Sequence, residues 1–244
     1  MKETESEWYA TWFDTPYYHI LYKNRDDEEA HGFMNELTSF ISLNSESHIL
    51  DVACGRGRHA VYLNKMGYTV TGIDLSESSI NYAKQFENNS LKFVRHDMCK
   101  PLGKQFDAVF NLFTSFGYFE KEVENVNAIK AMKANMKPEA YGVIDFLNIN
   151  YTQKYLIPSE KKEIDGIVFN INKWIEDGYL FKKISFSADG KEHEYTERLK
   201  CLDFNLFKTY LSEVGLKVRY IFGNYNLDAF DIENSERLIL IFKQ

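Results

Sequence analysis

Short apolar runs alternate along the middle of the chain with segments in which apolar residues recur every three or four positions. The runs are typical of buried strands, and the recurring pattern is typical of helices that cover a sheet. Between residues 45 and 149 we predict strands over 48–53, 69–73, 91–95, 106–113 and 141–147, with helices over 58–66, 76–86 and 123–136. Strands separated by helices imply right-handed crossovers, so the pattern predicts an α/β fold built on a parallel sheet.

The pattern changes after residue 150. Short strands are predicted over 167–171, 173–176, 180–187 and 192–200. Asp177-Gly178 and Asp189-Gly190 lie between them, and Asp-Gly pairs are a strong signal for hairpin turns. Residues 150–201 are therefore expected to form a small antiparallel β insert on the parallel core.

The last part of the chain, residues 202–244, returns to the core pattern. A predicted helix over 203–214 is closed by Gly215, and strands follow over 216–222 and 237–242. The loop between these strands is too short for a crossover helix. We therefore expect the two strands to form an antiparallel pair at the edge of the sheet.

Residues 1–44 form an N-terminal zone rich in aromatic side chains. Those before residue 23 are Trp8, Tyr9, Trp12, Phe13, Tyr17, Tyr18 and Tyr22. A helical pattern of apolar residues follows from Ala30 to Ile41. We interpret this zone as an arm packed on the main domain, with a lid over a pocket as the alternative. The expected parts are the arm 1–44, a core of 45–149 and 202–244, and the insert 150–201 near the substrate site.

Composition and charge narrow the class of protein. The chain has 244 residues and a net charge of −7, which argues against a broad surface for nucleic acid. Its three cysteines are odd in number and far apart, which argues against a disulfide framework or a zinc cluster. The N-terminus lacks a signal-peptide pattern, and no run of about 18 apolar residues occurs. We therefore expect a cytoplasmic protein that binds no metal and does not span a membrane.

The strongest chemical signal is the segment Asp51-Val52-Ala53-Cys54-Gly55-Arg56-Gly57, where a predicted strand turns into a helix. Gly55 and Gly57 have no Cβ, so the backbone can turn sharply and a ligand can approach the main chain. The helix that follows presents N–H groups at its start. In an open α/β sheet, ligands bind at this carboxyl edge of the strands.

Two more acidic residues follow the next two strands. Asp74 comes about twenty residues after the glycine turn, where a carboxylate can accept hydrogen bonds from both hydroxyls of a ribose. Asp97 ends another strand, and its carboxylate can accept from an adenine amino group while Met98 offers a backbone N–H to the ring. Acids at three successive strand ends indicate a ligand that contains adenosine.

A rival interpretation is a nicotinamide dinucleotide site, because Gly55-Arg56-Gly57-Arg58-His59-Ala60 fits the relaxed pattern GxGxxA. Asp51 argues against it, since this residue interrupts the apolar strand just before the turn and would repel a pyrophosphate. The same carboxylate would attract a zwitterionic amino acid that carries a sulfonium.

The run ILDVACGRGRHAVYLNKMGYTVTGIDLSESSINYAK resembles the first two motifs of the class I S-adenosylmethionine-dependent methyltransferases. HDMCKPL, FDAVFNLFTSFGYF and VIDFLN resemble the following motifs, so the resemblance covers residues 45–150. The segment from NINKWIEDGYLF to ERLKCL is similar to the antiparallel insert of a bacterial subgroup, and FDTPYYHILYKNRDDEEA to the arm of similar proteins. The resemblance implies a Rossmann-like seven-stranded sheet with an antiparallel terminal strand. It also implies S-adenosylmethionine as cofactor and S-adenosylhomocysteine as product.

The resemblance also implies residue roles at the methionine end of the cofactor. Asp51, Ala53 and the turn formed by Gly55 and Gly57 would line the methionine part, although the family usually has glycine where Ala53 stands. Tyr22 and Arg25 would close over the methionine carboxylate.

Other residues are implied at the adenosine and at the methyl group. Asp74 would bind the ribose, and Leu75 would lie against the adenine face. Asp97-Met98 would hold the adenine edge. Asn111 and Phe113, at the end of the fourth strand, would face the methyl group.

The expected reaction is an in-line displacement of the sulfonium methyl by an N, O, S or C atom, in which alignment supplies much of the acceleration. An acceptor that holds a proton needs a general base, for which His19, His31 and His59 are candidates and none is identified. Asp145 would orient the acceptor. Apolar walls around the acceptor would come from Tyr17, Tyr18, Phe116, Tyr118 and Tyr225.

The acceptor is expected to be a small molecule. Asn111-Leu112-Phe113-Thr114 differs from the Asn/Asp-Pro-Pro-Tyr/Phe signature of amino-group methylation on adenine or glutamine, and no Pro-Cys pair typical of cytosine methylation occurs. Two alternatives stay open: a methyltransferase that acts on tRNA or on a peptide or protein terminus, and a non-catalytic cofactor-binding protein. The sequence does not specify an oligomeric state.

Overall fold

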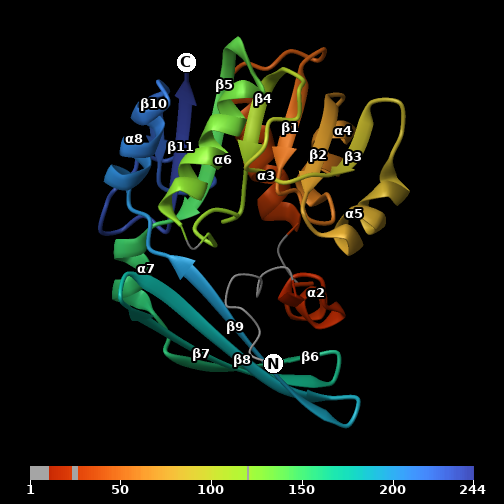
Figure 1. The fold of residues 1–244 in the computed structure, drawn as a ribbon, viewed down its shortest axis with the longest axis vertical. Coiled ribbons are helices and arrows are strands. Elements are labelled where there is room, and N and C mark those ends of the chain that lie inside the picture. The colour runs from red at the N-terminus through yellow and green to blue at the C-terminus, as the bar shows by residue number, and fades with distance from the viewer. Residues whose placement is uncertain (1–10, 24–26, 120) are drawn as a thin grey trace.

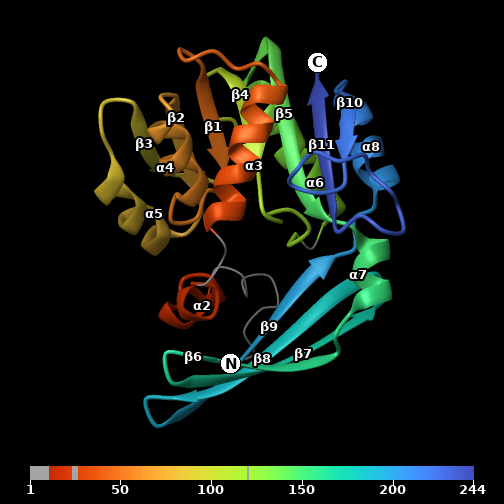
Figure 2. The same cartoon turned by 180° about the vertical axis from the view of Figure 1, so that it is seen from behind.

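The structure is a computed structural model that describes residues 11–23, 27–119 and 121–244. Two sheets are present, and Figures 1 and 2 show them from opposite sides. The larger sheet has seven strands in the order β10-β11-β5-β4-β1-β2-β3. The smaller sheet has four strands in the order β6-β7-β8-β9. This arrangement confirms the predicted α/β fold with an added antiparallel sheet.

The strands of the larger sheet follow the apolar runs of the sequence. They are β1 (His48–Val52), β2 (Thr69–Asp74), β3 (Leu91–Arg95), β4 (Phe106–Asn111), β5 (Met136–Leu147), β10 (Lys217–Phe222) and β11 (Arg237–Lys243). Strands β1 to β5 pair in parallel, whereas β11 is antiparallel to both β5 and β10. The predicted antiparallel pair at the edge of the sheet is therefore confirmed.

Helices cover both faces of the larger sheet. They are α3 (Asp27–Phe40), α4 (Arg58–Lys65), α5 (Glu77–Ala83) with the short 3-10 helix η2 (Lys84–Phe86), α6 (Glu122–Ala134) and α8 (Phe204–Glu213). Helices α6 and α8 lie on one face and α3 and α4 on the other, as the two views show. The predicted helix over 123–136 was too long: α6 ends at Ala134, and the Lys137-Pro138 pair belongs to β5.

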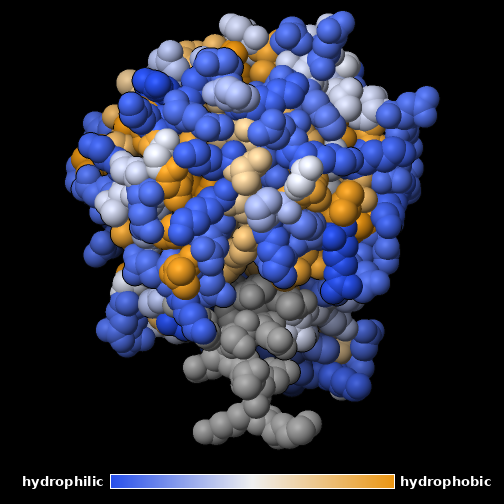
Figure 3. Space-filling view, turned by 45° about the horizontal axis from the view of Figure 1, so that its top comes forward, coloured by the Kyte–Doolittle hydropathy of each residue, from blue (hydrophilic) through white to orange (hydrophobic). Residues whose placement is uncertain are grey.

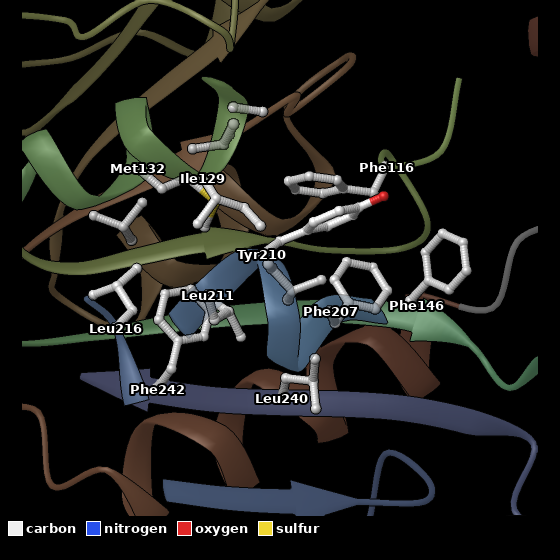
Figure 4. Packing of buried hydrophobic residues seen from close by; sticks show 14 of the residues in the cluster. Phe116, Ile129, Met132, Phe146, Phe207, Tyr210, Leu211, Leu216, Leu240 and Phe242 are labelled. Atoms are coloured by element: carbon white, nitrogen blue, oxygen red, sulfur yellow. The ribbon is translucent and has the colours of Figure 1, made fainter. Parts of the chain in front are cut away.

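The core on the α6 and α8 side is built from aromatic and aliphatic side chains. Figure 4 shows the rings of Phe116, Phe146, Phe207 and Tyr210 close together. The ring centroids of Phe146 and Phe207 are 5.2 Å apart, and those of Phe116 and Phe207 are 5.8 Å apart. Burying each such ring stabilises the fold by roughly 1.5–3 kcal/mol.

The insert contains more structure than the sequence pattern predicted. Its elements are α7 (Ile149–Tyr155), β6 (Ser159–Ile164), β7 (Ile167–Glu176), β8 (Tyr179–Ala188) and β9 (Lys191–Lys200). The predicted strands over 167–171 and 173–176 are one strand, β7. Its inward residues Phe169 and Ile171 alternate with Asn170 and Asn172, so the polar positions mark the outer face and not a break. Asp-Gly pairs with positive φ at both residues form all three hairpin turns.

The arm packs on the smaller sheet. Helix α2 (Pro16–Leu21) lies against the inner face of that sheet, which we define as the face toward α2 (Figure 1). The apolar cluster between them contains Trp12, Leu21, Phe169, Ile171, Ile184 and Phe186. The arm was expected on the main domain. Helix α3 packs there, and Phe13 contacts Tyr118 of the loop after β4, whereas Trp12 and α2 pack mainly on the insert. Trp8 and Tyr9 lie outside the described residues.

On the face shown in Figure 3, hydrophilic residues predominate, and hydrophobic ones form small separate groups. In the described part of the chain, no helix is long and apolar enough to cross a membrane. Within the same residues, no three His, Cys, Asp or Glu side chains gather as metal ligands, and all three cysteines are free thiols.

Candidate functional site

The turn between β1 and α4 has an unusual backbone. Ala53, Gly55 and Gly57 have φ values of 58°, 55° and 86°. A Cβ on Gly57 would lie 2.6 Å from the ring of Phe93, so only glycine fits there. A Cβ on Gly55 would meet nothing within 4 Å, so the space above this residue is open to a ligand. The turn thus brings bare main chain to the carboxyl edge of the sheet.

Asp51 lies under this turn and is 1% exposed. Its Oδ2 has no hydrogen-bond partner among the described residues. Burial raises the pKa of Asp51 to about 7, and the nearby charge of Asp74 adds to this, while the Ala60 backbone N–H and Arg58 oppose it. A buried polar atom without a partner costs about 1–3 kcal/mol. This oxygen therefore fits a donor that the chain itself does not supply.

Asp74 follows β2 at the same edge. Its Oδ2 accepts from the backbone N–H of Gly55 at 2.8 Å, and its Oδ1 accepts from that of Ser76 at 2.8 Å. Burial raises the pKa of Asp74, while these N–H groups lower it. The two bonds fix the carboxylate beside the glycine turn and leave each oxygen a further lone pair. Next to it, the side chain of Leu75 is 46% exposed.

The end of β3 brings the third acid to this edge. The backbone N–H of His96 donates to the carbonyl of Asp74 at 2.9 Å and holds the two loops together. The Oδ1 of Asp97 accepts from the backbone N–H of Cys99 at 2.9 Å, and its Oδ2 lies 3.3 Å from the ammonium of Lys100. Met98 packs against the core. The three predicted strand-end acids therefore lie along one edge of three adjacent strands.

The loop after β4 is held in a strained conformation. Phe113 and Thr114 have φ values of 64° and 65°, a region that side chains with a Cβ rarely adopt, at a cost of order 1–3 kcal/mol each. Before them, Asn111 is fully buried; its Nδ2 donates to the carbonyl of Val52 at 3.0 Å, and its Oδ1 has no partner among the described residues. The guanidinium of Arg58 lies 4.8 Å from the centroid of the Phe113 ring.

Asp145 on β5 holds this strained loop. Its Oδ2 accepts from the backbone N–H of Phe113 at 2.9 Å and from the hydroxyl of Tyr225 at 3.1 Å. Its Oδ1 forms an ion pair with Arg237 at 2.7 Å. Arg237 also donates to the hydroxyl of Thr114 at 3.1 Å. Asp145 was expected to orient the acceptor, but it is 1% exposed and both of its oxygens are engaged within the protein.

Arg237 is a residue beside the candidate site that sequence reasoning did not single out. It opens the last strand, 92 residues from Asp145, and the only signal was a charged residue at the start of a buried apolar run. Burial opposes its charge, but the adjacent Asp145 outweighs this and raises the pKa of Arg237. Burial and the Asp145 charge also raise the pKa of Tyr225 well above its usual range.

The remaining residues expected near the acceptor or over the methionine carboxylate fall into different places. Phe116 is fully buried in the core on the α6 and α8 side. Tyr17 donates to Asp189 at 2.8 Å at the hairpin between β8 and β9, and Tyr22 donates to Glu197 at 2.8 Å on the smaller sheet. Arg25 lies outside the described residues. The other two positions, Tyr18 and Tyr118, are joined through Phe13 at 4.9 and 5.3 Å.

The candidate bases are placed as follows. His59 is 8% exposed and lies on α4 behind the glycine turn. His31 on α3 stacks on Tyr62 of α4, with ring centroids 3.8 Å apart. His19 is on α2 and lies edge-on to Tyr18 at 5.3 Å. Of the three, only His19 lies on α2, the helix that packs on the smaller sheet.

The sequence of the chain is similar to those of proteins named as methyltransferases. Residues 49–139 match the family described as "Methyltransferase domain". The Bacillus subtilis protein YqeM, named as a methyltransferase, is 33% identical over 126 residues, which are 49% of this chain and 51% of YqeM. The chain thus aligns with about half the length of that relative. A Streptomyces fradiae enzyme named dTDP-3-amino-3,6-dideoxy-α-D-glucopyranose N,N-dimethyltransferase is 23% identical over 72% of each chain.

The fold has close counterparts among solved structures. An S-adenosylmethionine-dependent methyltransferase from Clostridium acetobutylicum superposes with a TM-score of 0.78 at 18% identity, covering 93% of this chain and 95% of that one. The superposition therefore includes the smaller sheet as well as the core. Residues 49–139 therefore match a methyltransferase domain, and the chain as a whole has the fold of solved S-adenosylmethionine-dependent methyltransferases.

Proposed function

We propose that this chain transfers a methyl group from S-adenosylmethionine to a small-molecule acceptor, and that the accepting atom is an amine nitrogen. The unpartnered Oδ2 of the buried Asp51 carries the cofactor half of the proposal. The ammonium group of an amino acid fits this oxygen, whereas a pyrophosphate does not. The Streptomyces fradiae relative, whose name specifies N,N-dimethylation of an amino sugar nucleotide, supports the acceptor half.

The residues along the carboxyl edge fit an adenosyl amino acid from end to end. In this proposal Asp51 binds the ammonium group, and the open space above Gly55 takes the methionine chain. The remaining lone pairs of Asp74 accept from the ribose hydroxyls. The exposed side chain of Leu75 covers one face of adenine, and Asp97-Met98 binds its edge.

The chemical role of the chain is to align the reactants. The bound cofactor supplies a methyl group on a positively charged sulfur. Asn111 and Phe113 shape the wall that faces this methyl, and the strained backbone at Phe113 is held by Asp145. Asp145 is thus a positioning residue and not a contact of the acceptor. Because an amine attacks only as the free base, we expect the rate to rise with pH.

The aromatic residues of the arm and of the loop after β4 support a small acceptor. The loop after β4 meets the arm through Tyr118 and Phe13, and the arm meets the smaller sheet through Trp12 and Tyr18. Aromatic side chains from the loop after β4, the arm and the smaller sheet thus pack in one continuous series. This arrangement favours a compact molecule over a nucleic acid, as does the net charge of −7.

Titration calorimetry tests the cofactor half. We expect heat with S-adenosylhomocysteine and none with NAD. The variant Asp74→Ala should lower the affinity for S-adenosylhomocysteine by one to two powers of ten, because it removes charge-assisted hydrogen bonds worth about 1.5–3 kcal/mol. Tight NAD binding without any response to S-adenosylhomocysteine would refute the proposal.

Transfer of an isotope-labelled methyl group tests the acceptor half. The labelled cofactor is incubated with amino sugars, glycine, bulk tRNA and short peptides, and the products are separated by mass. Label on the nitrogen of a small amine supports the proposal. Label in tRNA or on a peptide terminus, with none in the small amines, would replace it by the macromolecular alternative.

A further inference from the structure

A tight turn at the head of α2 joins three parts of the molecule. The backbone N–H and the hydroxyl of Thr15 both bond to the carbonyl of Trp12, at 3.0 and 2.9 Å. The Thr15 hydroxyl also accepts from the backbone N–H of Tyr18 and so caps α2. Residues Trp12–Thr15 are therefore fixed relative to the helix, and we call them the arm turn.

One end of the arm turn is anchored in the smaller sheet. Trp12 is 1% exposed and stacks on Tyr195 with ring centroids 4.4 Å apart. Its Nε1 donates to Oε1 of Glu197 at 2.8 Å, and the hydroxyl of Tyr22 donates to the same oxygen at 2.8 Å. Lys182 donates to the Tyr22 hydroxyl. One partly buried carboxylate thus bonds to residues on both sides of α2.

The other end of the arm turn reaches the larger sheet. The carboxylate of Asp14 accepts from the hydroxyl of Ser76 and, at 2.6 Å, from that of Ser78. Burial alone would raise the pKa of Asp14, but the serine hydroxyls outweigh it, so the pKa lies below its usual value and the group is ionised at neutral pH. Phe13, between the two anchors, packs on Tyr118 of the loop after β4.

The Asp14 anchor lies directly beside the expected ribose position. Ser76 donates its backbone N–H to Asp74 at 2.8 Å, and its hydroxyl caps α5 by accepting from Ser79. The charge of Asp14 acts on Asp74 strongly enough to contribute to its raised pKa. The arm turn is therefore attached to the residue that also fixes the ribose-binding carboxylate.

We propose that Asp14 is a positioning residue of the cofactor site, which holds the arm turn across the ribose end and slows the escape of the bound adenosyl compound. The inference rests on the proposed function, because it takes Asp74 as the ribose ligand. In this arrangement Glu197 is the fixed anchor and the two serine contacts are the ones that release. Cofactor exchange then requires the Asp14 contacts to break while α2 stays on the smaller sheet.

Stopped-flow measurement of S-adenosylhomocysteine release tests the proposal. The complex is chased with excess S-adenosylmethionine, and the dissociation rate constant is compared between variants. We expect Asp14→Ala to raise it about tenfold and Ser78→Ala to raise it less, since Ser76 still holds the carboxylate. Lys23→Ala is the matched control: it removes an exposed ion pair between the arm and Asp165 on the smaller sheet, and release should stay unchanged.

The fixed anchor is tested with two substitutions of one residue. Glu197→Gln keeps an oxygen that accepts from Trp12 and Tyr22, so release should stay near that of the unchanged protein. Glu197→Ala removes this oxygen and should speed release as Asp14→Ala does.

The outcomes separate this inference from the proposed function. If the unchanged protein does not bind S-adenosylhomocysteine, the proposed function itself fails. If it binds, and Asp14→Ala lowers only the melting temperature while release is unchanged, Asp14 is a structural contact and the inference is overturned. Faster release in Lys23→Ala of the same size as in Asp14→Ala would also overturn it, because any loosening of the arm would then have the same effect.

Discussion

Asp51 on β1 and Asp145 on β5 are matched in type, sheet and burial, each being 1% exposed near the carboxyl end of its strand. Their surroundings differ. Both oxygens of Asp145 are engaged by Arg237, Tyr225 and a backbone N–H, whereas one oxygen of Asp51 has no partner among the described residues. Two buried acids at one edge of the sheet therefore differ: Asp145 holds a loop, whereas Asp51 has an unpartnered oxygen, which we propose to bind the cofactor.

Removing the cation that pairs with Asp145 gives the largest expected effect. Arg237→Met leaves the Asp145 carboxylate buried without its cation, which costs about 3–5 kcal/mol in comparable cases. We expect a loss of that size in the free energy of unfolding, measured by urea denaturation. Replacing both residues, Asp145→Leu with Arg237→Met, should recover part of the loss. A loss below about 1 kcal/mol for the single variant would show that the pair does not support the loop.

Replacing Asp51, which has no such cation, should instead raise the free energy of unfolding. Burial raises the pKa of Asp51 from 3.8 to about 7, so the protonated form is favoured in the folded protein, and stability is lost as pH rises from about 4 to 7. Asp51→Asn removes this loss and should stabilise the ligand-free protein at pH 8, by up to about 4 kcal/mol.

The same substitution should weaken cofactor binding. We expect Asp51→Asn to lower the affinity for S-adenosylhomocysteine at least about a hundredfold, because the ammonium group loses its carboxylate. Calorimetry gives the affinity and urea denaturation the stability of the same sample. A variant that is destabilised and still binds normally would make Asp51 a structural acid like Asp145.

The pH dependence of binding sharpens the contrast further. Below about pH 7 Asp51 carries a proton in the ligand-free protein, and this proton must leave before an ammonium group can pair with the carboxylate. The affinity for S-adenosylhomocysteine should fall by up to about tenfold per pH unit between pH 7 and 5. In Asp51→Asn this slope should disappear, and any slope that remains reports on Asp74, whose pKa burial also raises. Equal slopes in both proteins would contradict the assignment.

The contrast between the two acids also explains what sequence reasoning can reach. The strand-end acids Asp51, Asp74 and Asp97 were predicted because a local pattern, an apolar run followed by a polar turn, places them at the carboxyl edge. The state of Asp145 was not predictable in this way. Its partner Arg237 lies 92 residues away, and the Tyr22 contact with Glu197 spans 175 residues. Such long-range contacts are set by tertiary packing, which a local sequence pattern does not predict.

The same limit applies to the fold. Strand β3 was predicted with its observed bounds, and two Asp-Gly turns located the hairpins on either side of β8, because both signals are local. Strand β6 was missed because its sequence, SEKKEI, lies at the edge of the smaller sheet with most side chains exposed and has no apolar run. Helix α7 was missed for a similar reason, since none of its residues is buried. Helices and strands with few buried side chains have no clear pattern of apolar residues in the sequence.

The smallest expected effect comes from removing one partner of the paired acid. Tyr225→Phe deletes the hydroxyl that donates to Asp145 but leaves Arg237 and the Phe113 backbone N–H in place, so the free energy of unfolding should fall by only about 1 kcal/mol. Because Tyr225 was also expected on the acceptor wall, the Michaelis constant of the acceptor is the second readout. If that constant rises severalfold while the affinity for S-adenosylhomocysteine is unchanged, the ring contacts the acceptor. If both stay constant, the hydroxyl of Tyr225 serves only to hold the loop after β4.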